Sequence, residues 1–505
     1  MDHSRLLVSL FAALTAVAAS AALAADWPEF AGHDDRNMVS PETGLPDTVN
    51  PGKKGAALHL KWTVKLSTKA YGTPVVANGR IFVGTNNNNP RLPQYTGDRG
   101  VLLCLDEKDG HLLWEFSTPR NGALKNFDHL GLGLCSSPYV DGDRLYLMTT
   151  RCELVCLTTA GLGGGNIGPF KDEAKYYSGA DFAKGGGKTF ELTKTDADIV
   201  WLYDLVKELK VSPHDSTDCS PLVHGDIVFT SSNNGVNQGH KVSDAPDAPT
   251  LCAFNKNTGA LVATDDCHMS RKVFHGHWSN PTLARINGKD AVLYGSGEGI
   301  LYAFDAEPVA SAEPGKAGLL QKLWSSDANP PEHRAKDYHN REGPSDVIGT
   351  PAIFKDRIYL TVGQDPNHGD GIGNLSCFDL NTGKVLWHDP TIHRSLCTCS
   401  IAEIGGQTLL FVGDFGGYVY CYDAITGKQY WVHNTESAIW GSTLVADGKV
   451  YVGNTRGELL VFAASKDKKI LSTNAFGSPI QNSPVAANGV LYVMTHTDLF
   501  AFTNQ

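Results

Sequence analysis

The sequence predicts an all-β protein, an eight-bladed β-propeller whose blades are four-stranded antiparallel sheets. One unit recurs eight times, each copy carries the signals of a hairpin turn, and Gly accounts for 53 of the 505 residues. This Gly content exceeds the usual ~7% and indicates many turns between many short strands. Two unrelated β-sandwiches are the alternative architecture that these observations leave open.

The first 25 residues predict a signal peptide. Arg5 supplies a basic start, an apolar run rich in Ala follows, and Ala22-Leu23-Ala24 has the small-x-small form of a cleavage site. A membrane anchor is the alternative, but no stop-transfer charge cluster follows. Elsewhere no apolar stretch approaches the ~20 residues that a membrane helix needs. The first cysteine is Cys104, so no lipid-anchoring cysteine lies beside the cleavage site. We therefore expect a periplasmic or secreted protein with no integral membrane segment after cleavage.

Residues 26–59 form a lead-in segment, and the propeller is expected to span residues 60–505. Each unit opens with Ser, Thr or Asn, usually before Pro, and continues with a β-rich run, a tight turn and a second run. Asn-Gly or Asp-Gly between alternating apolar residues is the strongest short-range signal for a hairpin. The predicted units begin at Thr73, Ser137, Ser220, Asn280, Thr350, Ser400, Ser442 and Ser483.

A third strand follows each hairpin, and most units then turn into a fourth strand that ends near a Trp. In the segment 379–387, Asp379 can bond the turn backbone, Gly383 supplies a left-handed conformation, and Trp387 closes the strand. The last unit lacks a fourth strand, whereas residues 60–66 form a spare strand with Trp62 in the usual place. We expect this strand to complete the last blade, because ring closure removes exposed edges.

These motifs resemble the repeat of the pyrroloquinoline quinone-like β-propeller family, whose signature is Ala-x-Asp-x-x-x-Gly-x-x-x-Trp. The matching pieces run from Cys377 to Trp387 and from Cys421 to Trp431, and the resemblance covers residues 60–505. The lead-in at 26–46 and the stretches 213–222 and 363–373 are similar to secreted members from planctomycete-type bacteria.

The composition limits the classes of partner. The net charge is −11, from 43 basic and 54 acidic residues, which argues against a nucleic-acid partner. Apolar residues make up 41% of the chain, enough to bury a sizeable core. The partner expected from the loops described next is a small molecule or a protein.

The two ends of the ring are expected to differ. Tight turns between the first and second strands of each unit share one end, which we call the plain face. The loops between second and third strands and between blades share the other, which we call the long-loop face. Two connections on the plain face, 159–197 and 306–320, are expected to be exposed loops. The long-loop face is predicted to hold the segments 85–100, 117–134, 231–250, 325–347 and 363–373.

Most of the 18 histidines fall on the long-loop face, and long loops on a rigid scaffold are where function usually lies. Residues just before each innermost strand should surround the mouth of the central channel, where carboxylate, imidazole and guanidinium groups can bind a polar small molecule or a metal. The predicted ligand-binding residues are His214, Asp215, Asp218, His275, His277, Arg341, Glu342, Gln364, Asp365, His368, His393 and Arg394.

His275 and His277 are the candidate metal ligands, because side chains two apart on a strand share a face. Two histidines are fewer than the three or four ligands of most zinc sites. Of the 11 cysteines, Cys135 and Cys152 are the candidate disulfide, since both fall at the loop end of the second blade. The segment 363–373 also offers oxygen ligands, although it does not match the twelve-residue calcium loop.

Two functions follow. The first is an exported, non-catalytic propeller that binds a ligand or a protein through the long-loop face. The second, implied by the resemblance, is a quinoprotein dehydrogenase that holds pyrroloquinoline quinone (PQQ) and calcium and oxidises an alcohol or sugar. Dehydrogenases of the family commonly carry adjacent cysteines, whereas Cys397-x-Cys399 is the nearest pair here. The family also includes a lipid-anchored propeller that helps assemble outer-membrane barrels, and that likeness is expected to be one of fold.

Overall fold

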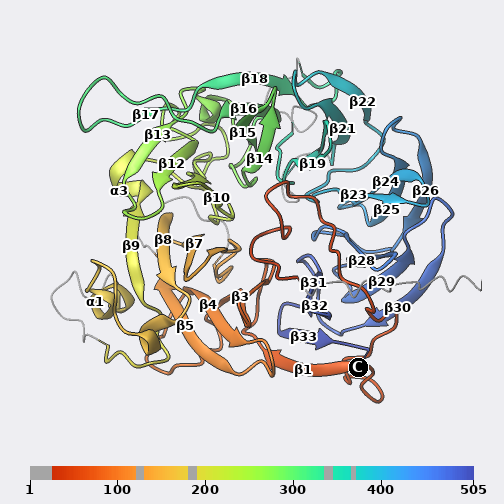
Figure 1. The fold of residues 1–505 in the computed structure, drawn as a ribbon, viewed down its shortest axis with the longest axis horizontal. Coiled ribbons are helices and arrows are strands. Elements are labelled where there is room, and N and C mark those ends of the chain that lie inside the picture. Colours follow the sequence, from red (N-terminus) through yellow and green to blue (C-terminus); the bar gives the residue numbers. More distant parts are fainter. Residues whose placement is uncertain (1–24, 121–129, 180–189, 335–344, 365–370, 505) are drawn as a thin grey trace, which may run out of the picture.

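The computed structural model describes residues 25–120, 130–179, 190–334, 345–364 and 371–504, and it confirms the predicted architecture. Over these residues the chain forms eight separate sheets arranged in a ring around one axis (Figure 1). Seven sheets have four strands, and the third blade gains a fifth strand. The predicted signal peptide, residues 1–25, lies outside the described residues except for Ala25.

The strands follow in chain order around the ring, innermost first in each blade. Blades one to four contain β2 (Val75–Ala77), β3 (Arg80–Asn86), β4 (Arg99–Asp106) and β5 (Leu112–Pro119); β6 (Tyr139–Asp141), β7 (Arg144–Met148), β8 (Glu153–Thr158) and β9 (Ile199–Asp204); β10 (Leu222–His224), β11 (Ile227–Ser231), β12 (Leu251–Asn255), β13 (Leu261–Thr264) and β17 (Gly318–Leu319); and β14 (Thr282–Ile286), β15 (Lys289–Gly295), β16 (Ile300–Asp305) and β18 (Lys322–Asp327). Blades five to eight contain β19 (Ala352–Phe354), β20 (Arg357–Gly363), β21 (Gly373–Asp379) and β22 (Val385–Asp389); β23 (Ser400–Ile404), β24 (Gln407–Gly413), β25 (Tyr418–Asp423) and β26 (Gln429–Asn434); β27 (Leu444–Ala446), β28 (Lys449–Gly453), β29 (Glu458–Ala463) and β30 (Ile470–Ala475); and β31 (Val485–Ala487), β32 (Val490–Met494), β33 (Asp498–Phe502) and β1 (Leu60–Lys65).

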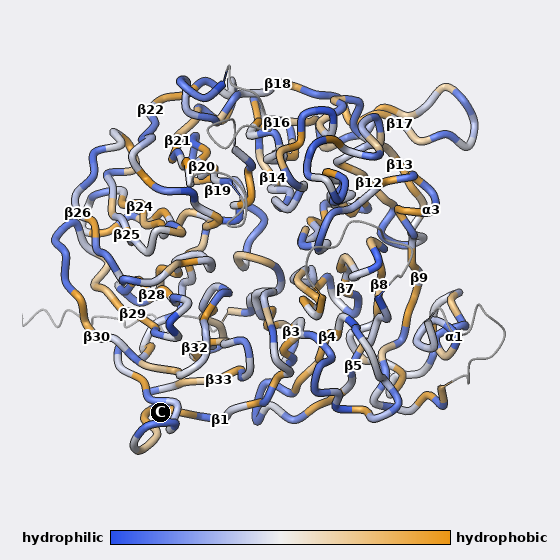
Figure 2. The backbone as a smooth tube through the Cα atoms, turned by 180° about the vertical axis from the view of Figure 1, so that it is seen from behind, coloured by the Kyte–Doolittle hydropathy of each residue, from blue (hydrophilic) through white to orange (hydrophobic). Residues whose placement is uncertain are grey.

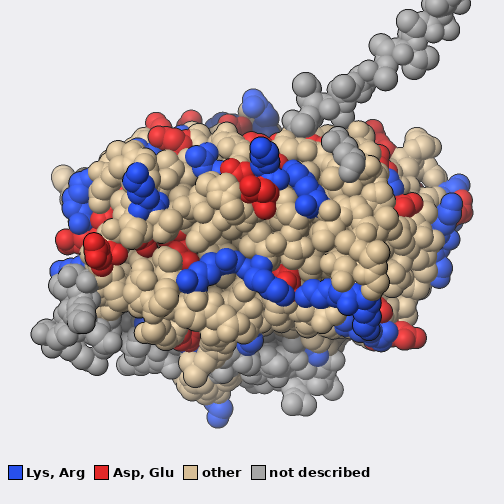
Figure 3. All heavy atoms as spheres, turned by 90° about the horizontal axis from the view of Figure 1, so that it is seen from below, with Lys and Arg blue, Asp and Glu red and all other residues tan. Residues whose placement is uncertain are grey.

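The N-terminal strand closes the ring, as predicted. β1 pairs antiparallel with β33, with Trp62 opposite Ala501 and Val64 opposite Leu499. Trp62 and Val64 face the core whereas Lys61 and Lys65 are exposed, so β1 alternates as a half-buried strand should. Figure 3 views this side of the ring and shows Lys and Arg in a band across it. Charged side chains on an outer strand oppose pairing with another chain.

The repeated Trp and Gly join neighbouring blades. Trp62 Nε1 donates to the Glu107 carbonyl in the next blade at 3.2 Å, and a Cβ at Gly110 would lie 2.6 Å from Val64 and 3.0 Å from the Trp62 ring. Trp387 repeats the arrangement: its Nε1 donates to the Ala424 carbonyl at 3.0 Å while its ring packs on Gly427. Gly is therefore required at these positions for two reasons: the backbone has a positive φ, and the indole leaves no room for a Cβ. The Trp and Gly of the sequence motif therefore indicate a contact between neighbouring blades as well as the end of a strand.

A belt of hydrogen bonds surrounds the axis at the start of the innermost strands. The backbone N–H of Thr350 donates to Thr398 Oγ1 at 3.0 Å, and that of Thr398 donates to Ser442 Oγ at 2.9 Å. Similar bonds connect Ser137, Ser220, Asn280 and, further on, Ser483. The belt corrects the sixth unit, whose equivalent residue is Thr398 and not Ser400. This shift of two residues was not evident from the sequence, because Cys399 stands where most other units have Pro.

The lead-in segment crosses the centre of the ring (Figure 1), and on the plain face it contacts every blade. It acts through main-chain and side-chain hydrogen bonds to the innermost strands and to the residues beside them. The contacts, in blade order, are Trp27–Val76, Pro28–Val140, Arg36–Pro221, Asp34–Leu283, Asp35–Ile353, Asn37–Ile401, Val39–Val445 and Ser40–Ala486. The central channel is therefore covered on the plain face, and Phe30 of this segment reaches its interior.

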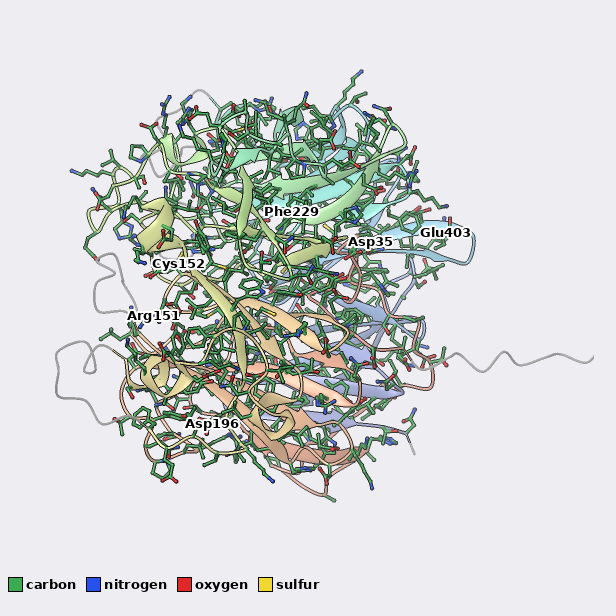
Figure 4. The ribbon with its side chains drawn as sticks, turned by 60° about the vertical axis from the view of Figure 1, so that its left-hand side comes forward. Asp35, Arg151, Cys152, Asp196, Phe229 and Glu403 are labelled. Carbon is green, nitrogen blue, oxygen red and sulfur yellow. The ribbon has the colours of Figure 1, made fainter. Side chains whose placement is uncertain are left out.

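Arg36 fixes the lead-in segment at the axis. Its side chain is fully buried, forms an ion pair with Glu29, and donates to the carbonyls of Pro221 at 2.9 Å and Pro281 at 3.1 Å. Burial raises the pKa of Glu29 above its ordinary value, whereas the Arg36 charge lowers it and favours the ionised carboxylate. In Figure 4, Asp35 of this segment lies on the opposite side of the molecule from Arg151 and Cys152, which belong to the long-loop face.

The two connections predicted to be exposed loops are partly structured. The first contains η1 (Gly161–Gly164) and α1 (Glu173–Ser178), and its Tyr177 is fully buried beside Tyr95 and Phe116 of the first blade. The second supplies β17, which pairs in parallel with β13. Two other short helices are α3 (Leu205–Leu209) and η2 (Met269–Arg271). Most described residues of both connections are exposed or partly exposed, as predicted, but Tyr177 of the first packs on the first blade and residues 318–319 of the second extend the third blade.

The core lies between blades and is built from the middle strands, such as β3 and β7, which are hydrophobic in Figure 2. Within the described residues, no helix is both long enough and apolar enough to cross a membrane.

Candidate functional site: the axial cavity

A cavity of about 400 Å³ occupies the axis at the long-loop face. All eight blades line it with the connections that precede their innermost strands. The residue two positions before the belt Ser, Thr or Asn faces it in every blade. These eight residues are Tyr71, Cys135, Asp218, Trp278, Ile348, Leu396, Trp440 and Gln481. Because the lead-in segment covers the other end, the cavity is a pocket that opens toward the long loops.

Aromatic rings form much of the wall. Trp278 is held by a bond from its Nε1 to the Ser216 carbonyl at 3.2 Å. Trp440 packs edge-to-face on Phe415, with ring centroids 5.4 Å apart, and lies 6.3 Å from Tyr71. Indoles fixed in this way offer flat apolar surface at little cost in conformational entropy.

The wall also carries charge. Asp215 and Asp218 supply carboxylates and Lys69 an ammonium group. Burial raises the pKa of Asp218 to about 6, and the Asp215 charge contributes to the rise, while bonds from Ser216 and Cys135 oppose it. Burial also raises the pKa of Tyr71 to about 12, so its hydroxyl stays protonated. The described wall therefore combines apolar faces with a modest excess of carboxylate.

Three histidines form a cluster directly behind this wall. One ligand atom each from His214, His240 and His275 lies within 4.8 Å of the others, and His214 and His275 are buried. Asp215, which lines the cavity, has Oδ2 4.0 Å from Nε2 of His275. The structure thus brings together three of the predicted residues, His214, Asp215 and His275, and adds His240.

His277 lies apart from this cluster, although it is two residues from His275. Its Nδ1 accepts from the Gly297 N–H at 2.9 Å and its Nε2 lies 3.1 Å from Ser270 Oγ. The ring is fully buried, and burial lowers its pKa to about 3. These contacts bind the neutral ring into the fourth blade.

Acidification should therefore weaken the fold through His277. The folded pKa is below the unfolded value, so the unfolded state binds the extra proton and stability falls as the pH drops below about 6.5. At pH 5 the expected loss is about 2 kcal/mol, from about 1.4 kcal/mol per pH unit. Urea unfolding at pH 7 and pH 5 measures it. The variant His277→Asn, whose amide oxygen can accept from Gly297, should lose less between the two pH values. Equal losses in both proteins would contradict the assignment.

The remaining predicted residues lie elsewhere or outside the described chain. His393 stacks on Tyr418, with centroids 5.5 Å apart, and the Arg394 guanidinium lies 5.5 Å from the centre of the Phe415 ring. Arg394 is not among the described lining residues of the cavity, and Phe415 contacts both Arg394 and Trp440 of the wall. Gln364 is buried and accepts from the Gly371 N–H at 3.2 Å. Four predicted residues lie outside the described residues: Arg341, Glu342, Asp365 and His368.

The candidate disulfide is not formed. All 11 cysteines lie in the described part of the chain, and all are free thiols. Cys152 is buried with its Sγ 3.1 Å from the Ser232 carbonyl oxygen, whereas Cys135 faces the cavity. The prediction failed because Cys135 and Cys152 lie at the same end of the second blade but their side chains point in different directions. Cys135 faces the cavity, whereas Cys152 points toward Ser232. Cys397 and Cys399 are also buried, whereas their neighbours Leu396 and Thr398 line the cavity.

Sequence reasoning missed most of the cavity wall. Tyr71, Lys69 and His240 are not among the residues that the sequence singled out. A usable signal was present: the position two residues before each belt residue is occupied by a large or polar side chain in most units. The position of His240 had no comparable signal, because a turn between Asn237 and Val242 sets it.

Comparison with known proteins connects the chain to two functional groups. A family model described as "Outer membrane protein assembly factor BamB" matches residues 59–161, 98–394, 371–464 and 416–505. The outer membrane protein assembly factor BamB of Burkholderia pseudomallei is 27% identical over 203 residues, which cover 39% of this chain and 49% of that protein. A 1-butanol dehydrogenase (cytochrome c) of Thauera butanivorans is 28% identical over 164 residues, which cover 30% of this chain and 21% of that protein. The chain thus spans less than half the length of these relatives.

Solved structures agree on the fold. A europium-containing methanol dehydrogenase has a TM-score of 0.59 at 12% identity, covering 95% of this chain and 98% of the other. BamB from Moraxella catarrhalis has a TM-score of 0.53 at 12% identity, covering 88% and 96%. At this identity the likeness shows the propeller alone. The predicted likeness to planctomycete-type members stays a prediction.

Proposed function

From the premise that this chain belongs to the family described as outer membrane protein assembly factor BamB, of PQQ-like β-propellers, we propose that it is a binding module that receives its ligand in the axial cavity. The observation that carries the proposal is the one-ended channel: the lead-in segment covers the plain face, and the cavity opens among the long loops. Among the described residues, the lead-in segment covers the plain face, so the long-loop face is the side from which a ligand would enter. Export to the periplasm or beyond, inferred from the predicted signal peptide, is part of the proposal.

The cavity suggests what the ligand looks like. Trp278 and Trp440 favour a flat or apolar part, and Asp215 and Asp218 favour a hydrogen-bonding or cationic part. Either a small molecule or a protruding segment of a partner protein can meet these demands. The similarity to a relative named as an assembly factor supports a segment of a partner protein as the ligand.

The second candidate is a PQQ-dependent dehydrogenase, supported by the similarity to the butanol dehydrogenase. The two indoles could provide a stacking floor. The charged residues of the described wall suit this cofactor poorly. The quinone is an acid and needs cationic partners, whereas the wall supplies one lysine, Lys69, and two carboxylates, Asp215 and Asp218. Within the described residues the cavity also gathers no set of three carboxylates and histidines for a metal. Binding without redox chemistry therefore agrees better with these residues.

A cavity-filling variant tests the proposal. Gln481→Trp places an indole in the cavity, and Lys466→Trp adds the same side chain to an exposed turn between β29 and β30. Intrinsic fluorescence is followed while small polar aromatic compounds and peptides are titrated into each protein. We expect saturable binding to weaken at least about tenfold in Gln481→Trp, equivalent to about 1.4 kcal/mol, and to persist in Lys466→Trp. Binding that Gln481→Trp leaves unchanged would place the ligand site elsewhere.

The dehydrogenase alternative has a separate readout. Wild-type protein is mixed with PQQ and calcium, and both retained cofactor absorbance and alcohol-dependent reduction of a dye are measured. The proposal expects neither. Uptake of the quinone together with turnover would replace the binding module by the enzyme.

A further inference from the structure

We propose that His214, His240 and His275 form a binding site for a divalent transition-metal cation of the zinc class. The three side chains come from two neighbouring connections, the one between blades two and three and the one between blades three and four, and from the loop between β11 and β12. Their ring centroids lie 4.5 Å to 5.0 Å apart. Imidazole nitrogen suits zinc, copper and nickel, whereas calcium and magnesium prefer oxygen, so the site is distinct from a calcium centre of the quinoprotein type.

A backbone carbonyl selects the His214 tautomer that suits a metal. The His214 Nδ1 lies 2.7 Å from the Val236 carbonyl oxygen. A carbonyl oxygen can only accept, so Nδ1 carries the hydrogen and, in the neutral ring, Nε2 carries the lone pair. Histidines that bind metals generally donate their other ring N–H to a carbonyl or carboxylate in this way.

The backbone around the cluster is built for close approach. A Cβ at Gly235 would lie 2.7 Å from the His214 Cβ and 2.8 Å from the His275 carbonyl oxygen, so only Gly allows the two histidines to meet here. The Val236 N–H donates to the same His275 carbonyl at 2.9 Å, which ties the loops together. His240 adopts a positive φ of 51° in a tight turn, and this turn directs it to the cluster.

The distances leave room for the cation. Ligand atoms are within 4.8 Å of one another, and tetrahedral zinc with Zn–N bonds of about 2.0–2.1 Å needs about 3.3 Å between nitrogens. The rings must therefore approach by about 1.5 Å or less, from the same bond lengths. His240, on a partly exposed turn, can supply most of this movement because His214 and His275 are buried.

Asp215 connects the metal site to the axial cavity. Its carboxylate supplies negative charge 4.0 Å from Nε2 of His275 and also lines the cavity. His275 in turn packs edge-to-face on Trp278 of the wall, with centroids 4.8 Å apart. A bound cation would thus hold one side of the wall in place, whatever ligand enters the cavity.

Metal titration of the full chain tests the site. Protein is freed of metal with EDTA, titrated with Zn²⁺ by calorimetry, and titrated with Co²⁺ while the visible absorption of a tetrahedral cobalt centre is followed. Three proteins are compared: wild type, His240→Ala, and His111→Ala. The last removes the exposed histidine of a second candidate group, Asp106, Asp109 and His111, and serves as the matched control.

We expect one Zn²⁺ per wild-type chain with micromolar or tighter affinity, an affinity at least about 100-fold weaker in His240→Ala, and no change in His111→Ala. The cobalt absorption should vanish only in His240→Ala. Because His240 is partly exposed, this variant should melt at the wild-type temperature in EDTA, and Zn²⁺ should raise the melting temperature of the wild type but not of the variant. The proposal is overturned if wild type takes up no Zn²⁺ at micromolar concentration, or if His240→Ala binds as wild type does. A failure here leaves the proposed binding function of the cavity standing, since that test uses Gln481→Trp.

Discussion

Replacing Arg36 by methionine is expected to lower the free energy of unfolding by about 3–5 kcal/mol, the usual result of removing one partner of a buried ion pair. The change leaves Glu29 without its counter-charge and removes the donor from the Pro221 and Pro281 carbonyls. Those contacts hold the lead-in segment at the axis, so the plain face should open at the same time. Chemical denaturation measures the loss, and proteolysis of residues 25–50 measures the opening.

The pH dependence of this variant provides its control. Burial raises the pKa of Glu29, and loss of Arg36 removes the contact that lowers it. A carboxyl with a raised folded pKa stabilises the fold below its unfolded pKa and loses that contribution as the pH rises through the folded pKa. The defect of Arg36→Met should therefore be larger at pH 8 than at pH 5. Adding Glu29→Gln should recover part of the loss at pH 8. A variant that is as stable as wild type at both pH values would show that the lead-in segment is not anchored by this pair.

Replacing Trp62 by alanine is expected to cost about 3–5 kcal/mol, as for other buried Trp or Phe truncations. Trp62 is almost fully buried, pairs with the last strand through β1, and packs on Gly110 of the first blade. Trp62 therefore contributes to the two contacts that close the ring, one with the last blade and one with the first. The change should appear as a lower midpoint in urea unfolding.

Two comparisons separate closure from simple packing. Trp62→Phe keeps a ring over Gly110 but loses the bond to the Glu107 carbonyl, and should cost less, about 1–2 kcal/mol. Trp387→Ala removes the equivalent indole from a blade whose four strands are contiguous in sequence. If Trp62→Ala also exposes the C-terminal strand to hydrogen exchange whereas Trp387→Ala does not, Trp62 acts through ring closure. Similar exchange in both variants would assign the effect to packing alone.

The repeat was predictable because each unit is specified locally. Asn-Gly and Asp-Gly turns fix hairpins, and the spacing from Asp379 to Trp387 records a turn and the indole that follows. The spare strand at Trp62 could be assigned to the last blade because one unit lacked a strand. The sixth unit was misaligned by two residues, since Cys399 replaces the Pro that marks the start in most of the others.

The candidate site was predictable only in part. His214, Asp215, Asp218 and His275 precede innermost strands, and such residues surround the axis in any propeller of this kind. His277 was predicted to accompany His275, but its ring faces Ser270 and Gly297. His275 and His277 lie in a segment that is not a regular strand. The alternation of side chains along a strand, which predicted that the two rings share a face, therefore did not apply.

The sequence by itself determined the number of blades, the closing strand, and the face on which long loops gather, because these depend on contacts between residues near in sequence or on a repeated pattern. Only the tertiary structure decided that residues 25–42 cover one end of the channel, that eight equivalent side chains form one cavity, and that His240 joins His214 and His275. These arrangements depend on where distant segments meet around the ring. No local pattern encodes such a meeting, because the groups that bond to one another lie far apart in the sequence.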